Sequence, residues 1–533
     1  MESLTSSVYE KKEKSKNKRN IEKIKSKFFF EKIFSYLSKG KSLNILKYNK
    51  TYQKILNIKI NDYKYYNETF TPIEIEIMPL EDIYGKFINF NSKQSYFHIY
   101  FNDSNKEMKR SYFTEDDKVK KIKIILDYNI KSFDNLFDNC ICIGSIYFRK
   151  FYRKNINSMV KMFFNCLLLK EIDFSHFNTK NVNDMSQMFF GCSSLKELDL
   201  RNFNTNNANN ISQMFLGCSS LKELDLSNFN TNNVIIMNGI FCGCSSLKKI
   251  NISSFNTNNI NDMSSMFCGC SSLKEINISN FITNNVNDFN LMFCGCSSLK
   301  EIDLSNFNTN NATNMSGMFF DCFSLKEIDL SNFNTNNVIN MNQMFYRCCS
   351  LEQLDISNFV TNNVNDMRDM FNQCSSLKTL DVSNFNTNNV TYMIGLFDGC
   401  SSLKKLNLSN FNTINVNDMT RMFYGCSSLE ELNISNFNTS NVVNLIGMFY
   451  ECSLLKKLDL SNFDTRNVII MNAMFYGCSS LEEIDLSNFN TNHVTNMNGM
   501  FYGCSSLKEK TFTHFIENNI NFKNEMFMDS PLD

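Results

Sequence analysis

The residues of this chain whose type and spacing could do chemistry are its 20 cysteines. Fifteen of them recur every 26 residues without a break, from Cys140 through Cys166 to Cys504. Thiols that stack about 4.8 Å apart in neighbouring repeats are close enough to oxidise to disulfides. The alternative is a column of free thiols, buried as small apolar side chains in a reducing compartment. The strict periodicity favours the buried column.

A thiolate metal site is a second chemistry to weigh. Three successive repeats contain Cys-Gly-Cys, which would place six sulfurs near one another: Cys242/Cys244, Cys268/Cys270 and Cys294/Cys296. The second cysteine of each pair already belongs to the periodic column, and no histidine joins the group. We therefore expect no metal and no cofactor.

Catalytic constellations are missing from the sequence. The four histidines, His98, His176, His493 and His514, are scattered and none repeats. A Ser-His-Asp or Cys-His arrangement has no support, and no glycine loop of the phosphate-binding kind occurs. We predict that the protein is not an enzyme.

The 26-residue interval predicts the architecture that positions these residues. A fixed period of 20 to 50 residues indicates stacked repeats, in which each coil buries its open faces against its neighbours. In the coil that begins at Cys192, Leu195, Leu198 and Leu200 alternate with Glu197 and Asp199, as in a strand near residues 196–201 with one buried face. Apolar residues spaced as in a helix or a succession of turns precede it: Val182, Met185, Met188, Phe189 and Cys192. We predict an α/β solenoid of about fifteen coils, with a parallel β-sheet on one face and short helices or turns opposite.

Two columns of phenylalanine should run through this stack. Phenylalanine occupies the position of Phe203 in all fifteen coils, from Phe151 to Phe515, and the position of Phe189 in all fifteen, from Phe163 to Phe527. We predict two internal aromatic ladders.

Outside the repeats, the chain divides by composition. We expect a basic, disordered segment at 1–27, a small N-terminal α+β region at 28–109 that is first helical and then β-rich, and an N-terminal cap at 110–139. A strand at 121–126 should pair with the first coil. The repeats fill 140–529, with the polar residues Lys510 and Lys523 closing the last coil, and 530–533 form a tail.

Charge distribution excludes one class of partner. Residues 1–130 carry 26 Lys and Arg against 17 Asp and Glu, whereas the rest of the chain carries 28 against 37. A nucleic-acid-binding array would show a basic stripe, so we expect no nucleic-acid partner. No window approaches 18 consecutive apolar residues, so we expect no membrane span. The first residues also contain no secretory signal peptide, which favours the cytoplasm.

One outward row of the strands, the Asp row, passes through Asp199. It holds Asp in nine coils and Asn in four, with Asp at 173, 199, 225, 303, 329, 355, 381, 459 and 485. Stacked like charges repel, and lysines at the strand start, such as Lys196, Lys222 and Lys300, could compensate them. The row either bonds between coils or binds cations or basic side chains of a partner. Its candidate binding residues are Asp199, Asp225, Asp303, Asp329, Asp355 and Asp381.

A second outward row, the Tyr row, directly follows the phenylalanines of the Phe189 column. It runs from Phe190 through Cys242, Cys268, Cys294, Phe320 and Tyr346 to four tyrosines near the C-terminal end. Its variation is typical of a binding surface, although packing at a coil edge explains it equally well. Tyrosine is favoured at interfaces. The candidates here are Tyr424, Tyr450, Tyr476 and Tyr502.

The repeat itself resembles a known family. The segments SSLKELDLSNFNTNNV and MFYGCSSL are similar to the leucine-rich repeats of BspA-like surface proteins, in the 26-residue form found in mycoplasma lipoproteins and anaerobic protists. The resemblance covers nearly three quarters of the chain. It implies a leucine-rich-repeat solenoid and a role in adhesion or in binding a protein or glycoprotein partner at the cell surface. The chain departs from the secreted members by lacking a lipid-attachment cysteine near its start and a wall anchor.

Residues 28–58 carry a second resemblance. Ile33-Phe34-Ser35-Tyr36-Leu37, followed by Leu43 and Leu46, follows the order of features in an F-box, although the usual Leu-Pro opening and the Trp are missing. The resemblance implies an intracellular substrate adaptor of a ubiquitin ligase. A small helical domain or cap is the plainer interpretation. The sequence leaves two functions open, a binding scaffold and such an adaptor, and it does not indicate the oligomeric state.

Overall fold

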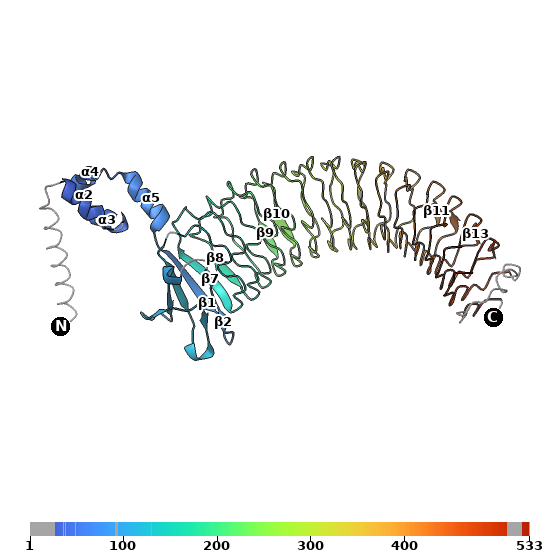
Figure 1. Ribbon diagram of the computed structural model, residues 1–533, viewed down its shortest axis with the longest axis horizontal. Coiled ribbons are helices and arrows are strands. Elements are labelled where there is room, and N and C mark those ends of the chain that lie inside the picture. Colours follow the sequence, from blue (N-terminus) through green and yellow to red (C-terminus); the bar gives the residue numbers. More distant parts are fainter. Residues whose placement is uncertain are drawn as a thin grey trace.

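The chain forms a long, curved stack of coils, with a small sheet and a group of helices at its N-terminal end (Figure 1). The computed structural model describes residues 27–35, 37, 39–47, 49–90, 94–128, 130–508 and 525–531. Three expectations fall outside these residues: residues 1–26 of the disordered segment expected at 1–27, Phe515, and the closing lysines Lys510 and Lys523. Lys27, the last residue of that segment, begins a helix.

Within the described residues, four helices precede the sheet: α2 (Lys27–Ser35), α3 (Lys39–Leu46), α4 (Lys50–Ile55) and α5 (Ile60–Phe70). The Asn49 side chain caps α4 by accepting from the backbone N–H of Tyr52, which satisfies a donor that has no partner within the helix. Phe34, Leu46 and Tyr52 form a small core of their own, separate from the main core. Figure 1 shows α2, α3 and α4 lying away from the stack, with α5 leading into the sheet.

A six-stranded sheet joins the helices to the stack. Its spatial order is β4 (Glu107–Met108), β3 (Phe97–Phe101), β6 (Ile122–Leu126), β1 (Ile73–Pro79), β7 (Ile143–Lys150) and β8 (Glu171–Asp173). Alternation places one face of β1 in the core, where Ile73, Ile75 and Ile77 are fully buried. All pairs are antiparallel except β7 with β8, and this parallel pair carries the sheet into the first coils. Short 3₁₀ turns lie at Gln94–Tyr96 and Glu115–Asp117, and β2 (Gly85–Lys86) pairs with β5 (Tyr112–Phe113).

The strand expected at 121–126 forms as β6, but its predicted pairing with the first coil is wrong. β6 pairs with β1 and β3, and β1 separates it from β7. β1 inserts between them because its buried isoleucines pair with buried apolar residues on both sides: Ile75 lies opposite Ile124 of β6 and Phe148 of β7.

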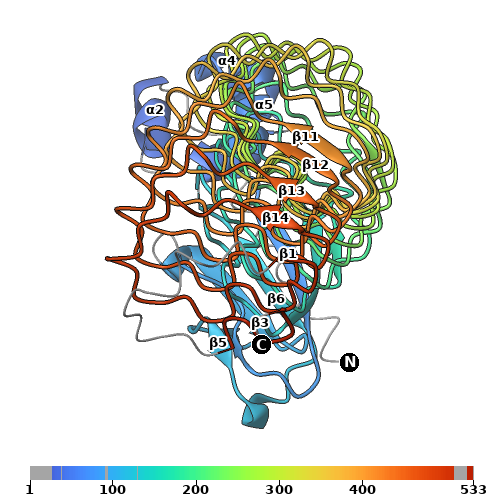
Figure 2. The ribbon, with the colours of Figure 1, turned by 90° about the vertical axis from the view of Figure 1, so that its right-hand side faces the viewer.

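The expected continuous parallel sheet of the array is fragmentary. Beyond β8, its strands are two or three residues long and pair two by two: β9 (Glu223–Asp225) with β10 (Lys249–Asn251), β11 (Lys405–Asn407) with β12 (Glu431–Asn433), and β13 (Lys457–Leu458) with β14 (Glu483–Ile484). No strand forms at 196–201. Figure 2 shows β11 to β14 stacked along one flank of the coils.

The continuous backbone ladder lies instead on the turn side of each coil. Phe163 N–H donates to the carbonyl of Met188 at 2.9 Å, and Phe189 N–H donates to that of Met214 at 2.9 Å, and this bond recurs along the stack. Parallel bridges in the same segment link successive coils from Ser132↔Ser158 to Ile470↔Asn496, with breaks between Ile236 and Asp262 and between Tyr392 and Asp418. The turn side therefore holds the coils in register.

The part of each coil that precedes the periodic cysteine, for which short helices or turns were expected, forms turns. Between 151 and 508 the structure describes no helix. Gln187 and Gly191 both have positive φ, 57° and 71°, and the same positions are left-handed in other coils. A left-handed residue every fourth position interrupts a helix, and N–H groups that bond to the next coil cannot bond within a helix.

One aromatic ladder is continuous and the second is looser. Rings of the Phe189 column stack from Phe137/Phe163 to Phe501/Phe527, with centroids 5.4 to 6.0 Å apart. Phe203 stacks on Phe229 at 6.4 Å, near the limit of ring contact. The described residues of both columns are buried, as predicted, except Phe489 and Phe527 near the C-terminal end, which are half-buried.

Ring spacings within a single pair of coils explain the curvature. Tyr450 and Tyr476 are 4.6 Å apart, Phe449 and Phe475 are 5.5 Å apart, and Phe463 and Phe489 are 6.4 Å apart. The distance between equivalent rings measures the local separation of two coils. This separation increases away from the Tyr row, so the coils splay. Paired strands need about 4.8 Å. The wider spacing accounts for the fragmentary sheet, where Lys222 N–H reaches the Lys196 carbonyl only at 3.4 Å.

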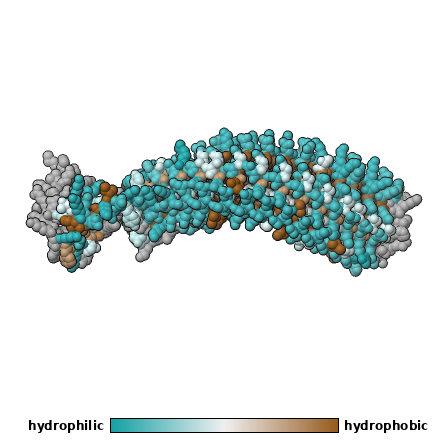
Figure 3. All heavy atoms as spheres, turned by 90° about the horizontal axis from the view of Figure 1, so that it is seen from above, coloured by the Kyte–Doolittle hydropathy of each residue, from teal (hydrophilic) through white to brown (hydrophobic). Residues whose placement is uncertain are grey.

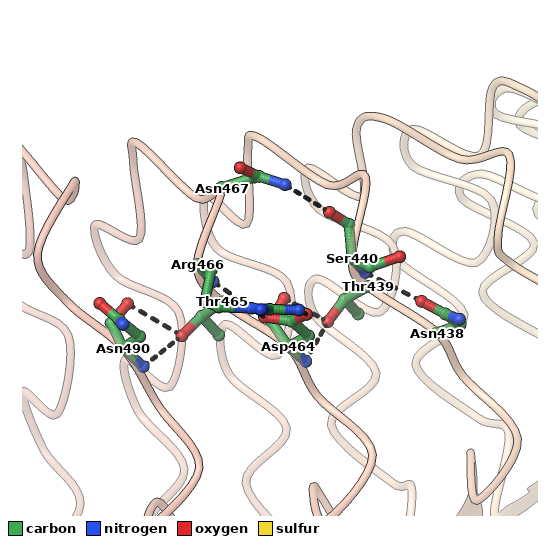
Figure 4. Close-up of polar contacts among 8 residues, drawn as sticks. All are labelled: Asn438, Thr439, Ser440, Asp464, Thr465, Arg466, Asn467 and Asn490. Carbon is green, nitrogen blue, oxygen red and sulfur yellow. Dashed lines mark hydrogen bonds and ion pairs between the residues drawn. The ribbon is translucent and has the colours of Figure 1, made fainter.

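Polar side chains reinforce the splayed region. Thr439 donates from Oγ1 to the Asp464 carbonyl at 2.9 Å and accepts from the Asp464 N–H at 2.8 Å, and Thr465 repeats this with Asn490 (Figure 4). The threonines of this column are buried throughout. The Asn467 amide bonds the Ser440 carbonyl at 2.7 Å. The repeated Asn-Thr-Asn-Asn therefore forms inter-coil ladders in addition to the turns that its residue types predict.

Candidate functional site

Asp row side chains point outward and are exposed. Asp303 Oδ1 accepts from the Ser305 N–H at 2.9 Å, Asp329 Oδ1 from the Ser331 N–H at 2.9 Å, and Asp225, Asp355 and Asp381 do the same. This bond to the residue two positions on ends the strand segment. It gives each carboxylate a local structural task.

The same contacts keep the row charged. The hydroxyl and backbone N–H of Ser305 lower the pKa of Asp303, and the equivalent serine lowers the pKa of Asp329 and of Asp355. Asp199 differs, because Arg201 bonds its carboxylate at 2.6 Å and lowers its pKa. Four consecutive coils, from Asp303 to Asp381, thus present a line of ionised carboxylates.

Among the described residues, no lysine forms an ion pair with Asp303, Asp329, Asp355 or Asp381, so the strand-start lysines do not compensate this part of the Asp row in the way considered from the sequence. Lys378, in the same column as Lys196, Lys222 and Lys300, lies 2.7 Å from Glu352, and Lys249, in the next column, lies 3.9 Å from Glu223, so these two lysines pair with glutamates between coils. Backbone N–H groups stabilise the aspartates instead. The outer carboxylate oxygens of the Asp303–Asp381 line face solvent.

Two shallow grooves follow the Asp row. One, of about 700 Å³, has Leu354 and Leu380 in its floor and Asp355, Asp381 and Lys405 at its rim. The other, of about 540 Å³, lies over β9 and β10. None of the four candidate tyrosines lines either groove, so the structure does not bring the two candidate rows together.

The tyrosines form a stack along the inner edge of the curve. Tyr424, Tyr450, Tyr476 and Tyr502 are half-buried, with neighbouring centroids 4.2 to 4.6 Å apart and nearly parallel rings. Burial and the neighbouring Tyr424 raise the pKa of Tyr450. Each ring face covers the next, so neighbouring rings leave only their edges uncovered. A sugar ring, which needs a free aromatic face to stack on, finds none between them.

A polar interruption in the Tyr row was missed by the sequence reasoning. Asn372 and Asp398 occupy the row between Tyr346 and Tyr424, and Asp398 is 2 % exposed. Arg421 lies 2.8 Å from the Asp398 carboxylate and over the Tyr424 ring at 4.1 Å. Burial raises the pKa of Asp398 to about 6 against the opposing charge of Arg421. Reading the row position by position, one residue per coil, would have found it.

The structure confirms the buried thiol column. All fifteen periodic cysteines are buried and free, and from Cys166 onward each Sγ bonds the carbonyl of a phenylalanine in the preceding coil, as Cys192 does with Phe163 at 3.1 Å. Burial raises the pKa of Cys192 well above its usual value. Within the described residues, no three His, Cys, Asp or Glu side chains form a group suited to a metal ion.

The three described histidines lie apart, as their positions in the sequence indicated, and His514 falls outside the described residues. His98 sits in the N-terminal sheet between Glu107 at 2.9 Å and Asp127 at 3.1 Å. His176 and His493 are exposed on separate coils. In the part of the chain that the structure describes, no nucleophile is recorded in contact with His98. The face seen in Figure 3 is mostly hydrophilic, with hydrophobic residues scattered over it.

Comparison with solved structures gives distant similarities. A leucine-rich repeat protein from Eubacterium ventriosum is 18 % identical, with a TM-score of 0.33 over 61 % of this chain and 81 % of that one. The TLR13–ssRNA13 complex is 15 % identical, with a TM-score of 0.22 over 71 % and 72 % of the two chains. The Drosophila Toll–Spatzle complex is 12 % identical, with a TM-score of 0.19 over 70 % and 56 %. No curated protein matches the sequence.

Among the described helices, none is both long and apolar enough to cross a membrane. A family model matches five overlapping stretches of the repeats, at residues 131–250, 237–354, 263–378, 348–453 and 428–531. Together they span the array and about three quarters of the chain. The chain therefore belongs to the family described as "Mycoplasma protein of unknown function, DUF285".

Proposed function

We propose that the protein is a non-enzymatic scaffold of the leucine-rich-repeat kind, which binds a protein partner through the flank that carries the Asp row. The observation that carries the proposal is the line of ionised, outward carboxylates from Asp303 to Asp381 beside a groove with an apolar floor. Such a surface favours a basic protein segment with a few apolar side chains.

The contacts around the tyrosines support a protein partner over a glycan. Their ring faces are covered by one another, whereas hydroxyls and ring edges suit protein surfaces. Adhesion at a cell surface, which the resemblance to BspA-like repeats implies, is the specific form of binding that we propose. Microscopy of the tagged protein with and without permeabilisation tests this form, and signal seen only after permeabilisation contradicts it.

The experiment for the Asp row removes the negative charges but keeps the hydrogen bond that each aspartate accepts from the serine N–H. The triple variant Asp303→Asn, Asp329→Asn, Asp355→Asn keeps an oxygen for the serine N–H, as natural Asn277 and Asn407 do. The full-length protein and the variant are each immobilised, and the proteins that each one captures from a lysate of the source organism are compared. The capture is done at low salt and at about 150 mM salt, where attraction between charges is screened.

The matched control removes the same charge from the neighbouring outward row. Glu275→Gln, Glu301→Gln and Glu327→Gln alter exposed residues that lie two positions before the Asp row on the same strand segments. We expect a captured partner to be lost with the Asp variant, to persist with the Glu control, and to weaken with salt. Equal retention by both variants would remove the Asp row from the proposal.

A second function, the F-box-like adaptor, has one observation in its favour. The helices α2 to α5 expose apolar side chains, with Phe28 65 % and Ile60 86 % exposed. Under this hypothesis the full-length chain retains a Skp1-like linker in a pull-down and loses it when Phe28 and Ile60 are changed to Ser. A chain that recovers neither this linker nor a cullin contradicts it.

A further inference from the structure

The cysteines fall into two chemically different classes. The fifteen of the periodic column are buried, and nearly all bond to a carbonyl of the preceding coil. Cys242, Cys268 and Cys294 are only half-buried and belong to the Tyr row, on the inner edge of the curve. We call these three the edge thiols. Reagents in solution can reach them without unfolding the stack.

Backbone hydrogen bonds hold neighbouring edge thiols at adjacent positions of successive coils. Gly243 N–H donates to the Cys268 carbonyl at 2.6 Å, and Gly269 N–H donates to the Cys294 carbonyl at 2.6 Å. Stacked rings elsewhere in the same row are 4.2 to 4.6 Å apart. Bonded ladder positions are about 4.8 Å apart, and disulfides form between Cα atoms about 4.4 to 6.8 Å apart.

Two further observations show close approach in these coils. Cys242 and Cys294 both lie close enough to the Cys268 thiol to shift its pKa. A Cβ added to Gly269 would lie 3.4 Å from the Cα of Gly243, and one added to Gly295 would lie 3.3 Å from the Cα of Gly269. The glycine of each Cys-Gly-Cys therefore lets the coils approach next to the edge thiols.

We propose that the edge thiols are a reversible oxidation site, in which Cys268 forms a disulfide with either Cys242 or Cys294 by exchange with a small-molecule disulfide. One edge thiolate attacks the small disulfide, forms a mixed disulfide and releases one small thiolate. The neighbouring edge thiolate attacks the protein sulfur of the mixed disulfide and releases the second. The protein loses two electrons and two protons, and the small disulfide becomes two thiols.

The disulfide joins the inner edges of two coils, whereas the third edge thiol stays reduced. The neighbouring Cys242 thiol lowers the pKa of Cys268, but the Cys294 thiol and burial together outweigh this effect and raise the pKa to about 11. The thiolate fraction of Cys268 therefore grows with pH across the neutral range, and exchange should accelerate about tenfold per pH unit below that value.

The test uses full-length protein and oxidised glutathione at about pH 8.5. Remaining thiols are blocked in denaturant at acid pH, and the protein is digested with trypsin without reduction. Cleavage at lysine places each edge thiol on its own peptide, 223–248, 250–274 or 275–300. We expect loss of two thiols per chain and a linked pair containing peptide 250–274, with fragmentation placing the bond at Cys268 and not at Cys270.

Variants make the assignment specific. Cys268→Ser should abolish every linked pair, because Cys242 and Cys294 are two coils apart, roughly 9 to 10 Å. Cys349→Ser is the control, since Cys349 is also half-buried but lies in another row, and it should leave the linkage intact. Linked peptides that persist in Cys268→Ser, bonds through Cys244, Cys270 or Cys296, or glutathione adducts alone in the parent would each overturn the proposal.

Discussion

At the scale of single residues, burial decides what a carboxylate does. Asp303 and Asp398 occupy outward rows of the same stack, yet contacts with Ser305 lower the pKa of Asp303, whereas burial raises that of Asp398 to about 6. The outward-pointing thiols differ from the column thiols for the same reason. Residue type alone therefore predicts neither the charge nor the reactivity of these groups.

Asp398→Asn should stabilise the protein near neutral pH. A carboxyl group in the unfolded chain has a pKa of about 3.9, so between about pH 4 and 6 the folded protein binds the extra proton. The contribution of Asp398 to the stability of the folded protein is most favourable below pH 4, declines as the pH rises to about 6, and is constant above pH 6. Urea unfolding should show the variant more stable by up to about 3 kcal/mol at pH 7 and equal to the parent at pH 4.

Asp303→Asn serves as the control for this pH profile, because its carboxylate is exposed and should show no such gain. A variant at Asp398 that is less stable than the parent at pH 7 would mean that the ion pair with Arg421 outweighs the cost of burial.

At the scale of the coil, side chains supply the hydrogen bonds between neighbouring coils where backbone groups are too far apart to bond directly. The turn side is joined by short N–H···O bonds, but the flank with the Asp row is splayed. There the hydroxyl of each buried threonine donates a hydrogen bond to a backbone carbonyl of the next coil and accepts one from a backbone N–H, in place of the missing bonds between strands. Their repetition is thus a structural requirement of the fold.

Thr335→Val should destabilise the stack by about 1 to 3 kcal/mol. Thr335 is fully buried, donates to the Val360 carbonyl at 2.8 Å and accepts from its N–H at 2.7 Å. Valine keeps the shape but leaves both backbone groups unpaired. Urea unfolding measures the loss, and hydrogen exchange at the Val360 amide should quicken.

Thr335→Ser retains the hydroxyl and removes one methyl group, so its cost should be only about 1 kcal/mol. If Val and Ser cost the same, the hydroxyl bridge between the coils contributes nothing measurable.

At the scale of the whole molecule, the stack has a single core and a curvature set by unequal spacing. Buried side chains form one continuous cluster from Ile73 in the N-terminal sheet to Met526. The coils lie 4.6 Å apart at the Tyr row and 6.4 Å apart at the Phe203 column in the same pair of repeats. Identical neighbours that splay in this way add up to the arch of Figure 1.

Deleting one whole period should leave the fold intact. Removing residues 304–329 joins Asp303 to Leu330 and restores the same local sequence, because EIDLSNF begins at both 301 and 327. Every ladder keeps its register, so urea unfolding should shift only slightly. Removing 304–316, half a period, places polar residues in core columns and should abolish cooperative unfolding. Similar curves for the two deletions would contradict a register-based stack.

Much of this protein could be predicted from its sequence. The period, the buried thiols and the buried Phe columns follow from repetition, because an apolar residue that recurs at one position of every coil has only the interior to occupy. The exposure of the Asp row follows from alternation along the strand segment. The binding role of that row, and of the Tyr row, stays a prediction.

Only the tertiary structure decided how the coils are joined and which outward groups are distinctive. The sequence favoured a parallel sheet, yet spacing that exceeds the strand distance moved the continuous ladder to the turns. Covered ring faces in the Tyr row, the buried Asp398 and the adjacent edge thiols likewise depend on distances between coils. Periodicity determines which residues share a column, whereas the separation within a column follows from how whole coils pack.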